Sequence, residues 1–395
     1  MMTSFISASP TTGSGSLDDF SLLGGPLHRL GARFGLVRGQ DNTIALGLAL
    51  GWLPWLVMIA LAMVEGVGDK LFSLSVIAGH VRLLIVIPLF FLCETSVDAK
   101  LREFIGLIVR SGVVPADQSP LLENEIARTV RWKDSWFSDA VCVLAAVALS
   151  IFAGQLHISG RTSSFDPGRV IGDAPLAGLW YWIVCLPLFR FLMFRWLWRI
   201  ALWWGFVWRL SRMDLRLVPA HPDGAGGLGY LEVVQMHFAA LVFSISIVVA
   251  ASFAEEISTG RTVFEVIYPA LAITIFVDLV LFLGPPCLFA FKLRTAQEKA
   301  LSDYSELAAR YVNAFEKKWL NTTPDEPLLG TPDLQSLADL GNSMAVVRNM
   351  RWAPFSTRLV ISILGASLAP MLPLFLFKYP AAALVEALFK KLAGL

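Results

Sequence analysis

Residues 176–237 read LAGLWYWIVCLPLFRFLMFRWLWRIALWWGFVWRLSRMDLRLVPAHPDGAGGLGYLEVVQMH, and this stretch decides the fold class. Its first part, Leu176 to Phe189, carries no charged side chain. The apolar pattern then continues to Leu210 and is interrupted by Arg190, Arg195, Arg199 and Arg209. A helix of about 20 residues crosses a lipid bilayer, so this run of about 35 must tilt or project beyond the membrane.

The tryptophans of this run form two groups, which are Trp180 and Trp182, then Trp196, Trp198, Trp203, Trp204 and Trp208. Indole rings concentrate where a membrane meets water. The spacing of the two groups, about 20 residues, therefore predicts two interfacial belts that anchor one helix.

The composition supports a membrane protein. Hydrophobic residues make up 56% of the 395-residue chain and charged residues 16%, which is too apolar for an ordinary soluble domain. The net charge of +1 gives no indication of a nucleic-acid partner. The four cysteines show neither CxxC nor CxxxH spacing, so we expect no metal site, and no motif indicates a cofactor. We predict an all-α, polytopic transmembrane bundle.

Seven segments are long and apolar enough to span a membrane. They cover about 43–64, 71–93, 136–158, 176–199, 236–254, 263–291 and 358–377. The chain then divides into a tail (1–42), a bundle (43–291) that includes a helical link (95–135) and a glycine-rich loop (217–230), a helical region (292–357) and a last membrane segment with an amphipathic helix (358–395). The first 16 residues are rich in Ser, Thr and Gly and predict a disordered tail without a signal peptide.

Lysine and arginine counts predict the orientation of the chain. The tail and the links on its side of the membrane hold about 21 of these residues and the opposite side about 7. We therefore expect a multi-pass protein of the bacterial inner membrane with a cytoplasmic N-terminus. Pro370 and Pro373 interrupt the last segment, so a re-entrant path is an alternative to crossing.

The links on the basic side look folded. Ser119-Pro120 and Thr331-Pro332 have the chemistry of helix starts, and apolar residues follow each pair at helical spacing. Apolar residues between Leu301 and Trp319 recur at intervals of three or four, which predicts another helix. We expect a small cytoplasmic helical layer, and contacts between copies in a homo-oligomer are one use for it.

Charges within spans are expensive and usually face a partner or water. The candidates for a pathway or an ion pair are His80, Arg82, Asp139, Arg190 and Asp278. The uncharged run from Leu83 to Cys93 is only about 16 Å long, too short to cross, so the span must include Arg82 at a depth of about 15 Å. Arg190 and Asp278 reach similar depths of about 21 and 22 Å, which makes them a candidate pair.

Arg195 and Arg199 lie four residues apart on one helical face, at the level of Asp139. They either snorkel to the cytoplasmic interface or remain inside the bundle. If Asp139 and Asp278 each form an ion pair with one arginine, the remaining arginines leave an excess of positive charge within the spans. Such an excess suits a small anion, an anionic lipid head group or water.

The loop after the fourth span contains His221, Asp223, Gly224, Gly226, Gly227 and Gly229. The glycines allow tight turns just before a helix N-terminus, where free N–H groups favour anions, and a structural turn is the alternative. The string from Val218 through Leu231 resembles a loop of uncharacterised bacterial multi-pass membrane proteins, a likeness that implies no function. His28 and His157 have no convergent partner in the pattern, and we predict surface positions for them.

Three functions are consistent with these sequence features. The first is a channel or transporter for a small anion, with Arg82 and Arg190 along the path and His80 as a protonation-sensitive gate. The second is a scaffold or sensor that acts through the cytoplasmic helices. The third is an enzyme acting on a lipid phosphate at the cytoplasmic face, with His221 and Asp223 near Arg195 and Arg199. No catalytic motif is present, so an enzyme is the less favoured class.

Overall fold

The computed structural model describes residues 20–22, 24–37, 43–156, 175–320, 327 and 330–378. Over these residues the chain is all-helical. Six helical runs are long and apolar enough to cross a membrane, or seven if α7 and α8, which meet at 46°, count as one broken span. The candidate runs are Ile44–Val64, Leu74–Arg110, Leu176–Arg212, Tyr230–Ser258, Phe264–Cys287 and Thr357–Lys378, with the bent pair Ser119–Asp134 and Trp136–Phe152 as the seventh.

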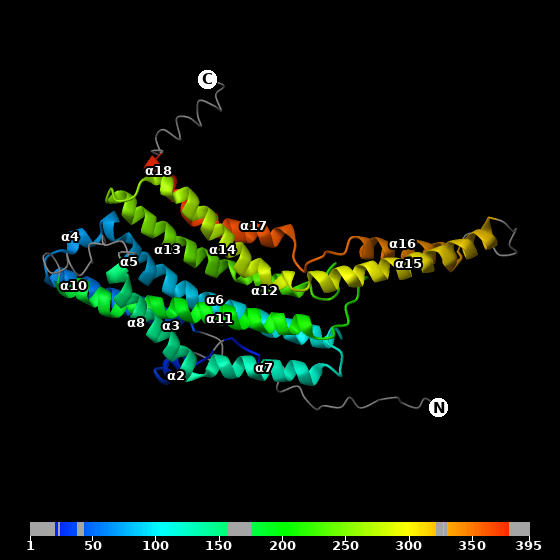
Figure 1. The fold of residues 1–395 in the computed structure, drawn as a ribbon, viewed down its shortest axis with the longest axis horizontal. Coiled ribbons are helices and arrows are strands. Elements are labelled where there is room, and N and C mark those ends of the chain that lie inside the picture. Colours follow the sequence, from blue (N-terminus) through cyan, green and yellow to red (C-terminus); the bar gives the residue numbers. More distant parts are fainter. Residues whose placement is uncertain are drawn as a thin grey trace, which may run out of the picture.

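The runs lie side by side along the long axis of the molecule (Figure 1). Their elements are α2 (Pro26–Arg33), α3 (Ile44–Val64), α4 (Gly68–Leu71), α5 (Ile77–Val81), α6 (Ile87–Arg110), α7 (Ser119–Asp134), α8 (Trp136–Leu156), α10 (Pro175–Trp180), α11 (Leu186–Arg212), α12 (Tyr230–His237), α13 (Ala239–Ser258), α14 (Ile267–Cys287), α15 (Ala290–Trp319), α16 (Pro332–Arg348), α17 (Thr357–Leu368) and α18 (Phe375–Lys378). We call one end of the bundle the α10 end and the other the α15 end.

Small residues let α3 approach its neighbours closely. A Cβ atom on Gly47 would lie 2.8 Å from the Phe91 side chain, and one on Gly51 would lie 2.2 Å from the backbone oxygen of Leu83. The two glycines are four residues apart, the spacing by which membrane helices pack backbone against backbone. Side chains at either position would therefore push α3 away from the run that contains α6.

Prolines shape the two longest runs. Each contains a π-helical turn, η2 (Arg82–Val86) or η3 (Tyr181–Cys185), and each turn ends two residues before a proline, Pro88 or Pro187. A proline has no N–H for the carbonyl one turn earlier, which widens the helix locally. The carbonyl of Leu84, four residues before Pro88, accepts the indole N–H of Trp52 at 3.3 Å instead.

Much of the tryptophan-rich run belongs to the core. Trp196 and Trp203 are buried, and Trp203 packs against Phe104 and Phe206 at ring distances of 6.3 and 5.9 Å. Trp204 donates at 2.8 Å to the carbonyl of Leu281, a group that Pro285 leaves without its helical partner. The prediction of two interfacial belts is therefore wrong for Trp196 and Trp203, because neighbouring helices cover this side of α11.

The last run does not turn back within the described residues. Its start is tied to the α15 end by Ser356, whose hydroxyl donates to Glu232 near the beginning of α12. Its other end lies beside the start of α14, where Lys378 Nζ is 3.0 Å from Glu265 Oε1 and Phe375 packs on Phe264. Pro370 and Pro373 fall in a 3₁₀ turn, η5 (Ala369–Leu374), that continues the run. The amphipathic helix predicted to follow this last membrane segment lies outside the described residues.

The predicted helices on the basic side are present. Helix α16 begins after Thr331 with Pro332 in its first turn, and α7 begins at Ser119. Helices α15 and α16 pack together as a hairpin that extends beyond the bundle (Figure 1). The other helix on this side, α7, packs against α11.

The end of the predicted tail is part of the bundle. Phe20 is fully buried, with its ring 4.7 Å from that of Phe206 on α11. The chain then passes Leu22, also buried, and enters α2. Burial of one phenylalanine side chain stabilises a fold by about 1.5–3 kcal/mol, so this segment is anchored.

Candidate functional site

Two polar clusters lie among the apolar helices, and the long run Leu74–Arg110 contributes to both. The Arg82 cluster consists of Arg82, Tyr181 and Ser252. The Glu94 cluster is a network of acidic and basic side chains described below. Twelve residues separate Arg82 from Glu94, which corresponds to about 18 Å along a helix.

Arg82 connects the two π-helical turns. It is the first residue of η2, and its Nη1 donates at 2.7 Å to the hydroxyl of Tyr181, the first residue of η3. Its Nη2 donates at 3.1 Å to Ser252 on α13. Because a π-helical turn shifts the direction of the side chains that it carries, such turns recur at functional sites.

The partners of Arg82 are hydroxyl groups, and within the described residues it forms no ion pair with a carboxylate. Its Nε is buried without a hydrogen-bond partner there, and the ring of Phe189 lies 5.8 Å from its Cζ. The buried Glu255 lies within electrostatic reach, although not in direct contact. Arg190, also buried, lies within electrostatic reach of Arg82 and donates at 2.7 Å to Ser150.

His80 sits beside this cluster with both ring nitrogens in use. Trp55 donates its indole N–H to Nδ1 at 2.8 Å, so Nδ1 is an acceptor and carries no proton. Nε2 then donates to the carbonyl of Leu71 at 2.6 Å. The geometry therefore describes a neutral imidazole with a fixed tautomer, stacked on Phe72 at 5.8 Å.

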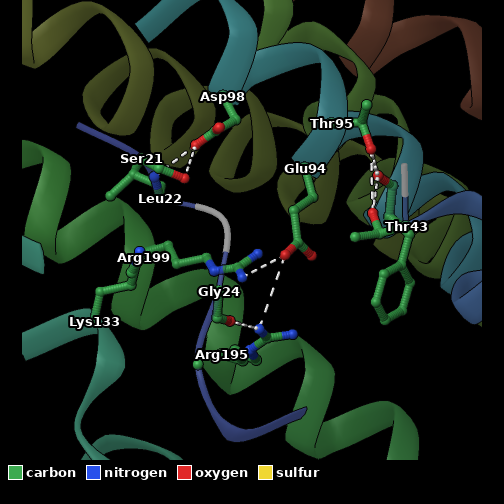
Figure 2. A network of polar contacts seen from close by, with 12 residues as sticks. Ser21, Leu22, Gly24, Thr43, Glu94, Thr95, Asp98, Lys133, Arg195 and Arg199 are labelled. Carbon is green, nitrogen blue, oxygen red and sulfur yellow. Dashed lines mark hydrogen bonds and ion pairs between the residues drawn. The ribbon is translucent and has the colours of Figure 1, made fainter. Parts of the chain in front are cut away.

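The Glu94 cluster is a closed ionic network at the junction of α6, α8 and α11 (Figure 2). Arg199 Nη2 lies 2.5 Å from Glu94 Oε1, and Arg195 Nη2 lies 3.8 Å from the same oxygen. Arg195 Nε is 3.9 Å from Asp139 Oδ1. Both arginines are nearly inaccessible, at 5% and 4% exposure for Arg195 and Arg199. Of the two alternatives for these arginines, snorkelling is therefore wrong, because carboxylates inside the bundle hold them.

The N-terminal segment completes this network (Figure 2). The carbonyl of Gly24 accepts a hydrogen bond from Arg195 Nη2 at 2.5 Å. One turn along α6 from Glu94, the carboxylate of Asp98 accepts the hydroxyl of Ser21 at 2.8 Å and the backbone N–H of Leu22 at 2.6 Å. Residues 21, 22 and 24 therefore contact α6 and α11, two of the helices that the ion pairs also join.

Sequence reasoning missed Glu94 and Asp98, because the predicted second span ended at Cys93. One signal could have found them. Glu94 and Asp98 are four residues apart on one helical face, as Arg195 and Arg199 are, and matched spacings of opposite charge on two helices favour pairing.

His28 on α2 is half-buried, so the predicted surface position is wrong. Burial lowers the pKa of its imidazole, and the nearby Glu94 carboxylate opposes this while Arg195 and Arg199 reinforce it. Its Nε2 is buried without a hydrogen-bond partner in the described chain. His157 lies outside the described residues.

The glycine-rich loop does bind an anion, and that anion is its own Asp223. The backbone N–H groups of Ala225 and Gly229 donate to the carboxylate at 2.8 Å each, and that of Gly227 at 3.1 Å. Burial raises the pKa of Asp223, but these hydrogen bonds together outweigh it and the net pKa is lowered from the ordinary 3.8. His221 Nδ1 lies 2.9 Å from Asp223 Oδ1.

Positive backbone angles make this loop possible. Gly224, Gly226 and Gly227 have φ of 61°, 65° and 97°, in the left-handed region that glycine tolerates best. Arg351 secures the loop, because its Nη2 donates to the backbone carbonyl of Asp223. Its Nη1 pairs with Glu232 at 2.8 Å. Within the described chain, neither Arg195 nor Arg199 contacts the loop.

The candidate pair of Arg190 and Asp278 is not formed. The carboxylate of Asp278 on α14 accepts the hydroxyl of Ser367 on α17 at 2.8 Å instead. Asp278 is buried at 2% exposure, and no cationic side chain of the described chain pairs with it. Arg190 and Asp278 therefore belong to separate sites.

The described residues contain no group of three or more His, Cys, Asp or Glu side chains that could hold a metal ion. No protein-family model, curated protein or solved structure matches the chain. The geometry of the site therefore carries the functional argument alone.

Proposed function

We propose that this chain is a multi-pass membrane transport protein that carries or conducts a small anion, with Arg82 as its principal anion-binding group. The positive-inside pattern of lysine and arginine supports a cytoplasmic N-terminus in a bacterial inner membrane. In that orientation the α15 end is cytoplasmic and Arg82 lies in the half of the membrane farther from the cytoplasm.

The single observation behind this proposal is the set of partners that Arg82 has. A guanidinium deep among apolar helices is costly unless it has a partner, and a structural arginine is usually matched by a carboxylate. Arg82 instead donates to the hydroxyls of Tyr181 and Ser252, and its Nε has no hydrogen-bond partner among the described residues. The hydroxyl of Ser252 accepts from Arg82 while it donates to the carbonyl of Val248 at 2.8 Å, so the guanidinium is the main donor that this site offers to an anion.

Arg82 lies near one further arginine and one carboxylate. Arg82 and Arg190 lie within electrostatic reach of each other, and Glu255 is the carboxylate within reach of Arg82. In the part of the chain that the structure describes, no carboxylate contacts Arg82 itself, so its positive charge has no direct ion-pair partner there. A positive charge without such a partner in a low-dielectric bundle attracts anions and repels cations.

Anion flux into proteoliposomes tests the proposal. The purified full chain is reconstituted into vesicles that contain a halide-quenched dye, and chloride or iodide influx is followed after a concentration jump. We expect Arg82→Gln to lower the initial rate by about tenfold, the equivalent of about 1.4 kcal/mol. Arg82→Lys keeps the charge but loses the planar fork, and we expect an intermediate rate.

Arg294→Gln is the matched control, because Arg294 is an exposed arginine on α15 that pairs with Glu298 at 2.9 Å. Exposed pairs contribute little, so the control rate should stay within about twofold of the wild type. Wild-type vesicles without anion flux, or an Arg82→Gln variant that folds and retains the full rate, would contradict the proposal.

A scaffold or sensor function is the second candidate, and the α15–α16 hairpin favours it. The buried residues of these two helices are Leu293, Gln297, Ala300 and Val347, all at the end that adjoins the bundle. The outer part of the hairpin is therefore available to a partner. Replacing residues 301–344 with a short Gly/Ser linker should abolish partner recovery and leave flux intact under this alternative. No observation favours the enzyme, since Asp223 is held by its own loop and Arg199 by Glu94.

A further inference from the structure

A cavity of about 240 Å³ opens between α11, α13 and α14. Its walls are apolar and include Phe90, Trp196, Ile200 and Ile245. Asp278 and Thr274 are the polar residues among those that line it. Because the hydroxyl of Thr274 donates to the carbonyl of Ala270 in its own helix, Asp278 is the group that remains for a ligand.

The cavity reaches the side of the bundle. Three of its lining residues are exposed: Leu197 at 43%, Ile273 at 64% and Val277 at 44%. They belong to candidate membrane spans, so in a bilayer this mouth faces acyl chains and not water. A ligand of this cavity must therefore be soluble in lipid.

Asp278, the acidic residue among those that line the cavity, selects the chemistry of the ligand. Asp278 is 2% exposed, accepts a hydrogen bond from Ser367, and has no cationic partner among the described residues. A carboxylate alone in apolar surroundings is strongly disfavoured, so the group holds a proton or a cation. A neutral amine that enters from the lipid satisfies both conditions, because it can take the carboxyl proton and remain as the ammonium of an ion pair.

We propose that this cavity binds a lipophilic primary amine, with its hydrocarbon body against α11 and α13 and its ammonium group on Asp278. The volume is adequate, since an apolar cavity of about 150 Å³ in another protein accepts benzene. An aryl ring with a short alkyl chain therefore fits within 240 Å³. This site is separate from Arg82, and the inference holds whether or not the chain transports anions.

Ligand-dependent thermal stability of the full-length protein in a nonionic detergent tests the inference. The probes are 4-phenylbutylamine and its uncharged analogue 4-phenyl-1-butanol, which have the same ring and chain. A ligand that binds only the folded state raises the unfolding midpoint in a saturable way. We expect the amine to raise it at concentrations about tenfold below those at which the alcohol acts, the equivalent of about 1.4 kcal/mol.

Three variants assign the effect to the cavity. Asp278→Asn keeps an acceptor for Ser367 but removes the charge, and we expect the advantage of the amine over the alcohol to disappear. Ile245→Phe fills the cavity and should abolish both responses. Ser367→Ala leaves the carboxyl in place, so the preference for the amine should persist. Equal action of the two probes on the wild type, no saturable response to the amine, or an undiminished preference in Asp278→Asn would each overturn the proposal.

Discussion

The Arg82 cluster and the Glu94 cluster hold arginines in the same bundle by different means. Arg199 is 2.5 Å from the carboxylate of Glu94, and Arg195 shares that carboxylate and approaches Asp139. Arg82 is held by two hydroxyl groups. Carboxylates therefore lie next to the arginines of the Glu94 cluster, whereas none in the described chain contacts Arg82.

The difference separates a structural role from a binding role. A buried ion pair fixes the relative position of the helices that carry it, because neither partner can leave without exposing an unmatched charge. A guanidinium that is hydrogen-bonded to hydroxyl groups can bind an anion without breaking an ion pair. The Glu94 cluster and the neighbouring Asp98 also hold Ser21, Leu22 and Gly24 of the N-terminal segment, so they join the tail to the bundle.

Removal of the central carboxylate should have the largest effect on stability. Glu94→Gln leaves Arg199 buried without a countercharge, and breaking a buried pair in this way costs about 3–5 kcal/mol. We expect a correspondingly lower unfolding free energy in detergent micelles. The double variant Glu94→Gln/Arg199→Gln should recover part of the loss, since neither charge remains. A loss below about 1 kcal/mol for the single variant would show that the cluster is not a closed ionic network.

The Asp223 loop holds a charge in a third way, with backbone amides as the main donors and His221 beside them. Asp223→Asn should lower the unfolding free energy at pH 7 by about 1–3 kcal/mol, because the amide is a weaker acceptor for these N–H groups. The folded-state pKa of Asp223 is lowered, so its contribution is present above the ordinary value of 3.8 and is lost as the pH falls below it. Denaturation of both proteins between pH 7 and pH 3 checks this. A gap that stays constant over that range would rule out the ionised carboxylate as its source.

The smallest effect on stability should come from a hydroxyl of the Arg82 cluster. Tyr181→Phe removes the acceptor 2.7 Å from Arg82 Nη1 and keeps the ring. We expect a loss of about 1 kcal/mol in the unfolding free energy, together with a changed half-saturating anion concentration in the flux assay. Tyr268→Phe is the control, because it removes a hydroxyl from an exposed tyrosine. Unchanged anion dependence in Tyr181→Phe would indicate that the hydroxyls play no part in binding.

The sequence alone determined the class of the protein and the course of its helices. Apolar runs of sufficient length, the Ser119-Pro120 and Thr331-Pro332 starts and the helical spacing before Trp319 are local features. Local features depend only on residues that are close together in the sequence. The structure has helices at all of these positions. The short uncharged run beside Arg82 likewise indicated that the helix must include this arginine.

The partners of the charged residues were decided only by the tertiary structure. Arg199 meets Glu94, Asp278 meets Ser367, and Asp223 meets the amides of its own loop. Which side chains meet across a bundle depends on how far each helix is rotated about its axis and shifted along it. Proline-induced turns and close glycine contacts set those rotations, and they act between residues that are far apart in the sequence.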